Sequence, residues 1–450
     1  MQHATTLSGG DARHVEKRAR LLRGLRWALL PMIACPLCTL SCAPRPIAGS
    51  TEIPPGIIRV PGLFRDVCPR WSHDGTRIAF LRRTTDRALQ LCIASADLTR
   101  VTALEPPEHV SPDRSYHTGL GRIATPETIA WSPDDRFVAV SRPEWFTFED
   151  GEKLVATGLW VCRVSNRSRQ PLAIHPKRYT RGFCFYRAPR WSPNDRYLAF
   201  LGEGIHGETA LFVRPLPAMP PTDVLPRFDR YEDVGWPAWS PDGSRLAFRQ
   251  GILRAYTADP VETLRVLTPG GAIAQAVAVL PAGGEYGPNP RIHGISWSPD
   301  GRQIAFAVVP DGRTLKSSRI YLASAGIGAG AQLLRLPSPY QHYGTFAPVW
   351  LGHRELGALQ VDDAGHFRAV LIKLPAQPNI AATVRPVCPL PTDDVDWSPD
   401  GRWIVCAEPD GARPGTRTTL RRYATGWKMQ DKHAVYANKD HEVSYIQTGG

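Results

Sequence analysis

Aromatic and basic side chains gather in a few long, irregular stretches of this chain. Indole, phenol and guanidinium groups held together can stack on sugar rings or grip a peptide, because they join flat apolar surface to hydrogen-bond donors. The same rings could instead pack over the ends of the core as satellite clusters. The candidates for a ligand-binding surface are Arg114, Tyr116, His117, Trp145, Phe146, Phe148, Tyr179, Arg181, Tyr186, Arg187, Tyr286, Tyr340, His342 and Tyr343.

Histidine side chains offer a second kind of chemistry. His117, His175, His206, His293 and His342 could act as metal ligands or bases if the fold brought them together. The sequence contains no Gly-x-Ser-x-Gly motif for a hydrolase nucleophile. Beyond residue 42 it contains no Cys-x-x-Cys pair of the kind that holds structural zinc. We therefore expect no metal or other cofactor, and we assign no catalytic residue.

One short motif recurs between these stretches. Trp397 begins the sequence Trp-Ser-Pro-Asp-Gly, and an apolar run follows it. Related turns follow five other Trp residues, and a degenerate seventh copy has kept its Trp but lost Ser-Pro-Asp-Gly. The Trp positions are 71, 131, 191, 239, 297, 350 and 397, so the spacing ranges from 47 to 60 residues. Self-similarity on this scale indicates a repeat architecture.

The composition of the motif predicts a tight turn between two antiparallel strands. Proline suits the second position of a type I turn, and the last position favours glycine because its backbone can be left-handed. Asp135 and Asp195 replace that glycine in two copies, and Asp tolerates this geometry better than most residues. The short β-runs that follow each turn bring the expected number of strands in a repeat to four.

Seven four-stranded repeats predict an all-β fold, a single seven-bladed β-propeller of antiparallel blades, over residues 56–426. The Trp-Ser-Pro-Asp-Gly turn followed by Ile-Ala-Phe resembles the WD-like repeat of TolB-type β-propeller proteins. Residues 1–55 leave no room for the N-terminal α/β domain of TolB, so only the propeller is similar. Oligogalacturonate lyases are built from similar blades and use a metal with a basic group.

The topology of such a blade predicts which residues are structural. The recurring Trp should pack between blades, and the recurring Asp should cap its own turn. The long connections should lie on the face opposite the turns, where function concentrates. These connections are 105–128, 141–157, 175–188 and 268–294. The strand that closes the ring could come from Gly56–Val60 or from the tail near His433–Tyr436.

The N-terminus has the layout of an export signal. A basic segment from Arg13 to Arg26 precedes an apolar one that ends at Cys42, so residues 1–42 are expected to be a signal peptide. Thr39-Leu40-Ser41-Cys42 resembles a bacterial lipobox, which implies lipidation at Cys42, and ordinary cleavage near Ala43 or Ala48 is the alternative. Residues 43–55 are a Pro-rich linker, and residues 427–450 form a tail.

The charge of the chain bears on its binding partners, and the positions of its cysteines bear on their chemical state. The formal charge is +12, and +8 of it lies beyond residue 42, spread without a Lys/Arg-rich run, so nucleic acid is not an expected partner. Cysteines in apolar runs are expected to be buried free thiols. The expected function is an exported or envelope-anchored, periplasmic binding or scaffolding module for a protein or glycan. The alternative is a carbohydrate-active enzyme such as a polysaccharide lyase.

Overall fold

The structure of the protein is a computed structural model. It describes residues 64–84, 88–105, 108–109, 128–147, 153–173, 183–204, 209–216, 232–252, 261–269, 274–281, 283–310, 314–326, 328, 330–338, 340–376, 380–409 and 418–425. All of them belong to one compact body, Gly49–Gly450. The expected signal peptide with Cys42, the linker, strand 56–60 and the tail lie outside the described residues.

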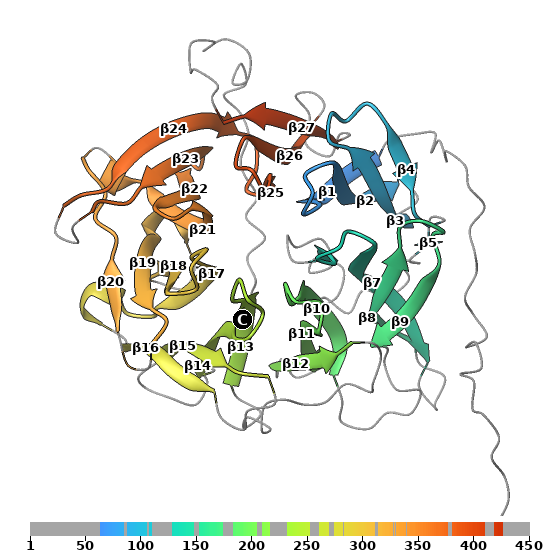
Figure 1. Ribbon diagram of the computed structural model, residues 1–450, viewed down its shortest axis with the longest axis horizontal. Helices are drawn as coiled ribbons and strands as arrows, with labels where there is room; N and C mark the ends of the chain where they lie inside the picture. Colours follow the sequence, from blue (N-terminus) through green and yellow to red (C-terminus); the bar gives the residue numbers. More distant parts are fainter. Residues whose placement is uncertain are drawn as a thin grey trace, which may run out of the picture. The chain divides into compact units, whose positions relative to one another are not determined.

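The described residues form an all-β structure of antiparallel sheets, as the repeats predicted. Six of the seven recurring Trp residues end the first strand of a repeat, and Trp350 lies two residues before the end of its strand. A hairpin leads from the first strand to the second in each repeat. Figure 1 shows the sheets following one another around a common centre, with β1, β10, β13, β17, β21 and β25 nearest to it. Three short 3-10 helices are described besides the strands: η2 (Gly284–Tyr286), η3 (Leu315–Ser317) and η4 (Tyr340–His342).

Three sheets contain one repeat each, with four strands in simple antiparallel order. Their strands are β13 (Glu232–Trp239), β14 (Leu246–Ile252), β15 (Val261–Leu267), β16 (Gln275–Pro281), β17 (Arg291–Trp297), β18 (Gln303–Val309), β19 (Arg319–Ser324), β20 (Ala331–Leu333), β21 (Gly344–Gly352), β22 (Glu355–Val361), β23 (Phe367–Lys373) and β24 (Thr383–Leu390).

Two larger sheets each join two neighbouring repeats. In each, the first strand of one repeat pairs in parallel with the third strand of the preceding repeat, at Arg65 with Thr418 and at Phe185 with Thr157. The first sheet contains β25 (Val395–Trp397), β26 (Trp403–Pro409), β27 (Thr418–Ala424), β1 (Phe64–Trp71), β2 (Arg77–Thr84), β3 (Ala88–Ser95), β4 (Val101–Ala103) and β5 (Glu108–His109). The second contains β6 (Ile129–Trp131), β7 (Phe137–Thr147), β8 (Lys153–Arg163), β9 (Arg169–Ala173), β10 (Phe183–Trp191), β11 (Tyr197–Gly204) and β12 (Thr209–Pro215).

The repeated turn has the predicted geometry. In the last repeat the N–H of Gly401 donates to the carbonyl of Ser398, and φ of Gly401 is 65°. Asp135 and Asp195 stand at the same position with φ of 56° and 57°. The Asp of the turn accepts bonds from its own turn, as Asp400 does from the Ser398 hydroxyl and the Arg402 N–H. The interpretation of this Asp as a local cap is confirmed.

The core lies between successive sheets. One apolar cluster joins Leu264 and Leu280 of one sheet to Ile304 and Phe306 of the next. Nine residues after the recurring Trp, the second strand has a fully buried ring in four repeats: Phe80, Phe200, Phe248 and Phe306. Burying one such ring contributes about 1.5–3 kcal/mol. The apolar run after each turn therefore holds neighbouring sheets together.

The recurring Trp also joins neighbouring repeats. The indole N–H of Trp131 donates to the carbonyl of Arg70, at 2.9 Å, and Arg70 precedes the Trp of the previous repeat. The same bond runs from Trp191 to Ala130, from Trp239 to Arg190 and from Trp297 to Ala238. These bonds confirm the structural interpretation of the motif, because they occupy the indole N–H and leave its ring packed between sheets.

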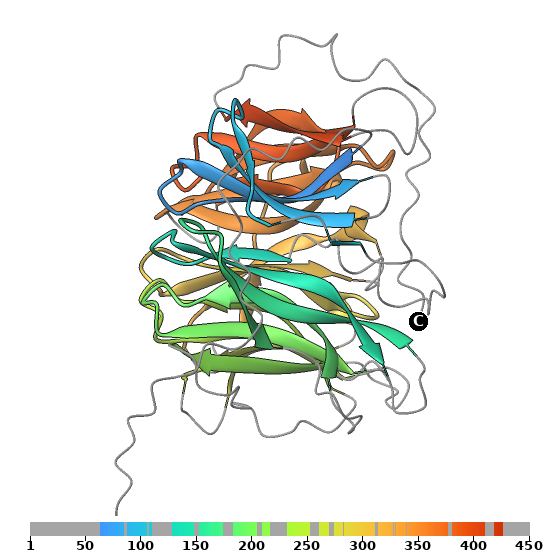
Figure 2. The same cartoon turned by 90° about the vertical axis from the view of Figure 1, so that its right-hand side faces the viewer.

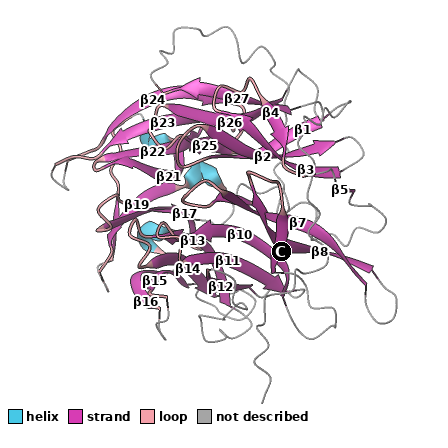
Figure 3. Ribbon diagram, turned by 45° about the vertical axis from the view of Figure 1, so that its right-hand side comes forward, coloured by secondary structure: helices cyan, strands magenta, loops and turns pink. Residues whose placement is uncertain are grey.

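Two stretches expected as loops contain strands. Residues 141–147 and 153–157 continue the pairing of β7 with β8 out to Thr147 and Lys153, so these two strands form a long hairpin. Figure 3 shows this hairpin reaching beyond the neighbouring strands. Residues 268–294 include β16 and the start of β17. The prediction of long irregular loops was wrong there, because the apolar and polar residues of 141–147 and 153–157 do not alternate regularly.

Candidate functional site

The two ends of the sheets differ. The recurring turns lie at one end, called here the turn end, and Figure 2 shows such short turns gathered on one side. The connections from second to third strand and between repeats lie at the other, the loop end, because antiparallel strands alternate in direction. Six of the predicted ligand-binding residues lie outside the described residues: Arg114, Tyr116, His117, Phe148, Tyr179 and Arg181.

Four other predicted residues lie on strands or short helices. Trp145 and Phe146 belong to the projecting part of β7, where the structure describes the backbone alone. Tyr186 packs edge-on against Phe200, with ring centroids 5.8 Å apart, so this ring belongs to the core. Arg187 lies 3.5 Å from the carboxylate of Glu203.

Tyr286 is also used for packing. It lies on η2, 5.5 Å from the ring of Tyr321, against the apolar cluster between two sheets. The hydroxyl of Tyr321 donates to the carbonyl of Glu285 and so fixes this helix. Tyr186 and Tyr286 therefore pack against the core, which was the alternative to a role in ligand binding.

Tyr340, His342 and Tyr343 do come together at the loop end. They lie on or next to η4, which leads into β21. The guanidinium carbon of Arg368 is 3.7 Å from the ring centre of Tyr343 and 5.4 Å from that of Tyr340. Gln360 accepts from Nε and Nη2 of Arg368 at 3.0 and 2.8 Å, which holds the guanidinium in place. His342 is exposed beside them. The result is a fixed aromatic and cationic surface.

Buried ion pairs lie in the loop-end half of the strands, and sequence reasoning missed them. Asp66 binds Arg82 of the paired strand through both carboxylate oxygens, at 2.7 and 2.9 Å. Glu105 pairs with Arg142, and both side chains are almost fully buried. Pairs of this kind fix one arrangement of neighbouring strands, since removing one partner leaves a buried charge. The available signal was a charged residue at the end of a second-strand apolar run.

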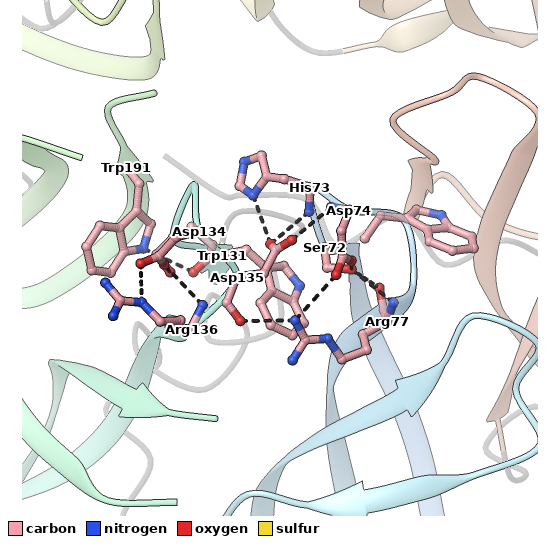
Figure 4. Close-up of polar contacts among 12 residues, drawn as sticks. Ser72, His73, Asp74, Arg77, Trp131, Asp134, Asp135, Arg136 and Trp191 are labelled. Atoms are coloured by element: carbon pink, nitrogen blue, oxygen red, sulfur yellow. Dashed lines mark hydrogen bonds and ion pairs between the residues drawn. The ribbon is translucent and has the colours of Figure 1, made fainter. Parts of the chain in front are cut away.

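The turn end carries a network between adjacent turns. Figure 4 shows Asp135 of one turn facing the preceding one, where it accepts from the N–H groups of His73 and Asp74, both at 2.8 Å. Nδ1 of His73 lies 3.1 Å from the same carboxylate, and Arg77 donates to the Asp135 carbonyl. The polar groups of this network bind one another between the two turns, so few donors or acceptors are left for a ligand.

The innermost strands carry a second recurring feature. Five of them contain a bulge three residues before the Trp, and the bulged residue has positive φ: Cys68, Ala188, Trp236, Gly294 and Ala347. A proline follows it in four of these strands, as in Ala188-Pro189-Arg190-Trp191. Bulges re-aim side chains and gather next to functional sites. The recurring pattern X-Pro-X-Trp, in which X is any residue and the first X is the bulged one, was the signal for these bulges in the sequence.

The described residues offer no group of three or more His, Cys, Asp and Glu side chains that could hold a metal ion. His293 and His342 are described, whereas His117, His175 and His206 lie outside the description. Cys92, Cys162, Cys388 and Cys406 are buried free thiols, as expected from their apolar surroundings. In the described part of the chain, no helix has the length and apolar character to cross a membrane.

Sequence comparisons find no match, either to a protein-family model or to a curated protein. Solved structures share the fold. A puromycin-hydrolyzing peptidase of Mycobacterium tuberculosis superposes with a TM-score of 0.52 at 16% identity, over 84% of this chain and 54% of that one. A prolyl endopeptidase gives a TM-score of 0.52 at 14% identity, over 81% of this chain and 48% of that one. This chain thus spans about half the length of either enzyme.

The similar structures also include TolB and other β-propeller proteins. A protein assigned as TolB from Agrobacterium tumefaciens matches with a TM-score of 0.41 at 14% identity, over 72% of this chain and 94% of that one. At these identities the likeness concerns the fold alone. The predicted resemblance to TolB-type propellers is therefore a likeness of fold and says nothing of function.

Proposed function

We propose that the sheets are the blades of one seven-bladed β-propeller over residues 56–426. Three observations support this reading. Each of the seven Trp residues lies at or near the end of the first strand of its repeat. Indole bonds link successive repeats. The last repeat also binds the first, because Asp394 and Asp396 accept from the N–H groups of Cys68 and Trp71 at 2.6 and 2.7 Å.

We further propose that this propeller is a binding or scaffolding module whose loop end recognises a protein or a glycan. The observation that carries the proposal is the surface formed by Tyr340, Tyr343 and Arg368, with His342 beside it. A guanidinium held beside two phenol rings by Gln360 offers stacking and donors without a large loss of side-chain entropy on binding.

The location of this activity follows from the N-terminal sequence. We propose that residues 1–42 direct export to the periplasm or cell envelope, with Cys42 as a lipid anchor, and that residues 43–55 link the anchor to the propeller. Residues 427–450 remain a tail in this proposal. Labelling cells with a lipid precursor, in the parent and in Cys42→Ser, tests the anchor, and equal labelling of both chains would refute it.

Binding is tested by affinity capture from envelope extract and by a glycan array, with the mature chain as bait. Tyr343→Ala removes the ring closest to Arg368, and we expect it to weaken any specific partner by about ten-fold, the scale of a binding hot spot. Ile380→Ala is the matched control, because Ile380 is a 54% exposed apolar residue in the connection between β23 and β24, at the turn end.

Deleting the outer part of the β7–β8 hairpin, residues 144–156, tests the rest of the loop end, because that part projects beyond the other strands. Loss of the partner in Tyr343→Ala or in the hairpin deletion, with binding kept in Ile380→Ala, supports the proposal. Equal binding by all variants would sink it.

A further inference from the structure

Trp236 has an unusual place among the bulged residues of the innermost strands. The other four are small, namely Cys68, Ala188, Gly294 and Ala347, and all five have φ between 48° and 57°. A bulky side chain in this left-handed region is strained, and such strain gathers where a site requires a particular side chain. Trp236 is also partly exposed, unlike the buried Ala188 and Cys68.

The Trp236 ring faces His293 of the next repeat. Their ring centres are 4.7 Å apart, and the planes are tilted by 48°. His293 directly precedes Gly294, the bulged residue of β17, so two adjacent bulges aim these rings at each other. Both rings remain partly exposed on strands that lie nearest the centre in Figure 1.

Two guanidinium groups lie beside this ring pair. Arg249 on β14 is opposite Gly235 on β13, and a Cβ on Gly235 would lie 2.8 Å from Nε of Arg249. Glycine therefore lets the Arg249 side chain cross the strand next to Trp236. Arg291 is two residues before His293, and its side chain is 24% exposed.

Glu262 holds the two guanidinium groups in position. Its carboxylate lies 3.1 Å from Arg249 and 4.0 Å from Arg291, and it accepts the N–H of Ile292 at 3.0 Å. Burial, followed by the positive charges of Arg249 and Arg291, lowers the pKa of His293 to about 4. His293 is thus a neutral donor and acceptor at neutral pH, in a positive local potential.

We propose that Trp236, His293, Arg249 and Arg291 form a binding site for a carboxylate joined to a flat apolar group. Guanidinium groups bind carboxylates through paired, charge-assisted hydrogen bonds, and the neutral imidazole adds one donor. The indole supplies the apolar surface on which the rest of the ligand packs. The site shares no residue with the loop-end surface around Tyr343, so this proposal does not depend on the partner proposed for that surface.

The site has two candidate sources of ligand with this chemistry, a small aromatic acid and the C-terminal residue of a peptide. We use 3-phenylpropanoate to represent the small acid and the peptide Ala-Ala-Phe to represent the C-terminal residue. Each is titrated into the mature chain in a calorimeter. The matching amides, 3-phenylpropanamide and Ala-Ala-Phe-NH₂, lack the carboxylate. We expect each acid to bind at least about ten-fold more tightly than its amide, since the charge-assisted bonds are lost. The tighter of the two acids identifies the source.

Two substitutions test the residues. Arg291→Gln and Trp236→Gly should each weaken binding of the tighter acid by about ten-fold or more. Trp236→Gly should also raise the melting temperature, because glycine adopts positive φ without strain. Ala188→Gly is the matched control: it relaxes the same bulge in another repeat and should leave binding unchanged.

The pKa of His293 can be measured by following the NMR signal of its ring through a pH titration, with His293→Gln to assign the signal. We expect this pKa to rise when the acid is bound, because the anion offsets the nearby positive charge. The inference is overturned if acid and amide bind equally, or if Trp236→Gly melts higher than the parent and still binds as tightly. An unchanged pKa of His293 in protein saturated with the acid would also overturn the inference.

Discussion

The carboxylate of Asp396 accepts a 2.7 Å hydrogen bond from the backbone N–H of Trp71, which lies 325 residues earlier in the chain. Asp394, two residues before it, accepts from Cys68 in the same way. The last repeat therefore binds the first through side chains as well as through the pairing of β27 with β1. The carboxylates that make this contact are partly buried, and this has a measurable consequence.

Asp394 should make stability depend on pH in an unusual direction. Burial raises its pKa to about 6, above the ordinary 3.8. The folded state therefore binds the proton more tightly than the unfolded state, so this group adds stability as pH falls from above 6 towards 4. Asp394→Asn keeps an acceptor for Cys68 and removes the charge. We expect it to be about 1–2 kcal/mol more stable than the parent near pH 7.5 and equal to it near pH 4, by urea unfolding.

Asp300→Asn is the contrasting variant. The hydroxyl of Ser298, followed by the Arg302 N–H, lowers the pKa of Asp300, so its carboxylate stabilises the fold above the ordinary pKa and loses that effect in acid. This variant should be less stable than the parent at neutral pH and approach it in acid. The same pH trend in both variants would contradict the assignment of Asp394.

The contribution of an indole bond between repeats should appear as a difference in the free energy of unfolding between two Trp→Phe variants. Trp131→Phe removes the donor to the Arg70 carbonyl, whereas Trp71→Phe removes an indole N–H that has no partner among the described residues. Both lose similar ring area and are similarly buried. We expect Trp131→Phe to reduce the free energy of unfolding by ~1 kcal/mol more than Trp71→Phe. Equal losses in denaturant unfolding would show that the bond contributes nothing.

Asp135 and Asp195 should respond oppositely to glycine. Both have positive φ, which glycine adopts more readily. Asp135 also accepts from the His73 and Asp74 N–H groups, but Asp195 is exposed and no side-chain bond of it is described. Asp195→Gly should therefore stabilise the protein by up to ~1 kcal/mol, and Asp135→Gly should destabilise it by about 1–2 kcal/mol. Thermal unfolding decides, and a gain in both variants would remove the role given to the network in Figure 4.

The buried thiols should be inert in the folded protein. Burial raises the pKa of Cys92 and of Cys388 to about 12, so almost no thiolate is present at neutral pH. In a Cys184→Ser chain that begins at residue 49, a thiol reagent should label Cys92, Cys162, Cys388 and Cys406 at the rate of global unfolding. Rapid labelling without denaturant would show that these sites open locally.

The sequence predicted the parts of the fold that repeat, since Trp397 and its turn encode a local structure in a few adjacent residues. It did not predict the pairing of Glu105 with Arg142 or of Asp394 with Cys68, because these partners are far apart in the chain and only the fold brings them together. Of the predicted surface, Tyr340 and Tyr343 surround Arg368, a residue that no local pattern marked. Tyr186 and Tyr286 turned inward, because a ring beside a strand end can pack as readily as bind.

The indole bonds between repeats all point the same way along the chain, and this has a consequence for biosynthesis. The donors are Trp131, Trp191, Trp239 and Trp297, and each acceptor carbonyl belongs to the repeat synthesised just before. A newly made repeat thus finds its acceptor already in place and can dock as it leaves the ribosome. The contacts between the first and the last repeat must wait for the end of translation; they include those of Cys68 and Trp71 with Asp394 and Asp396 and the pairing of β1 with β27. Assembly of the ring can follow the order of the gene, with its first repeat kept open until the last arrives.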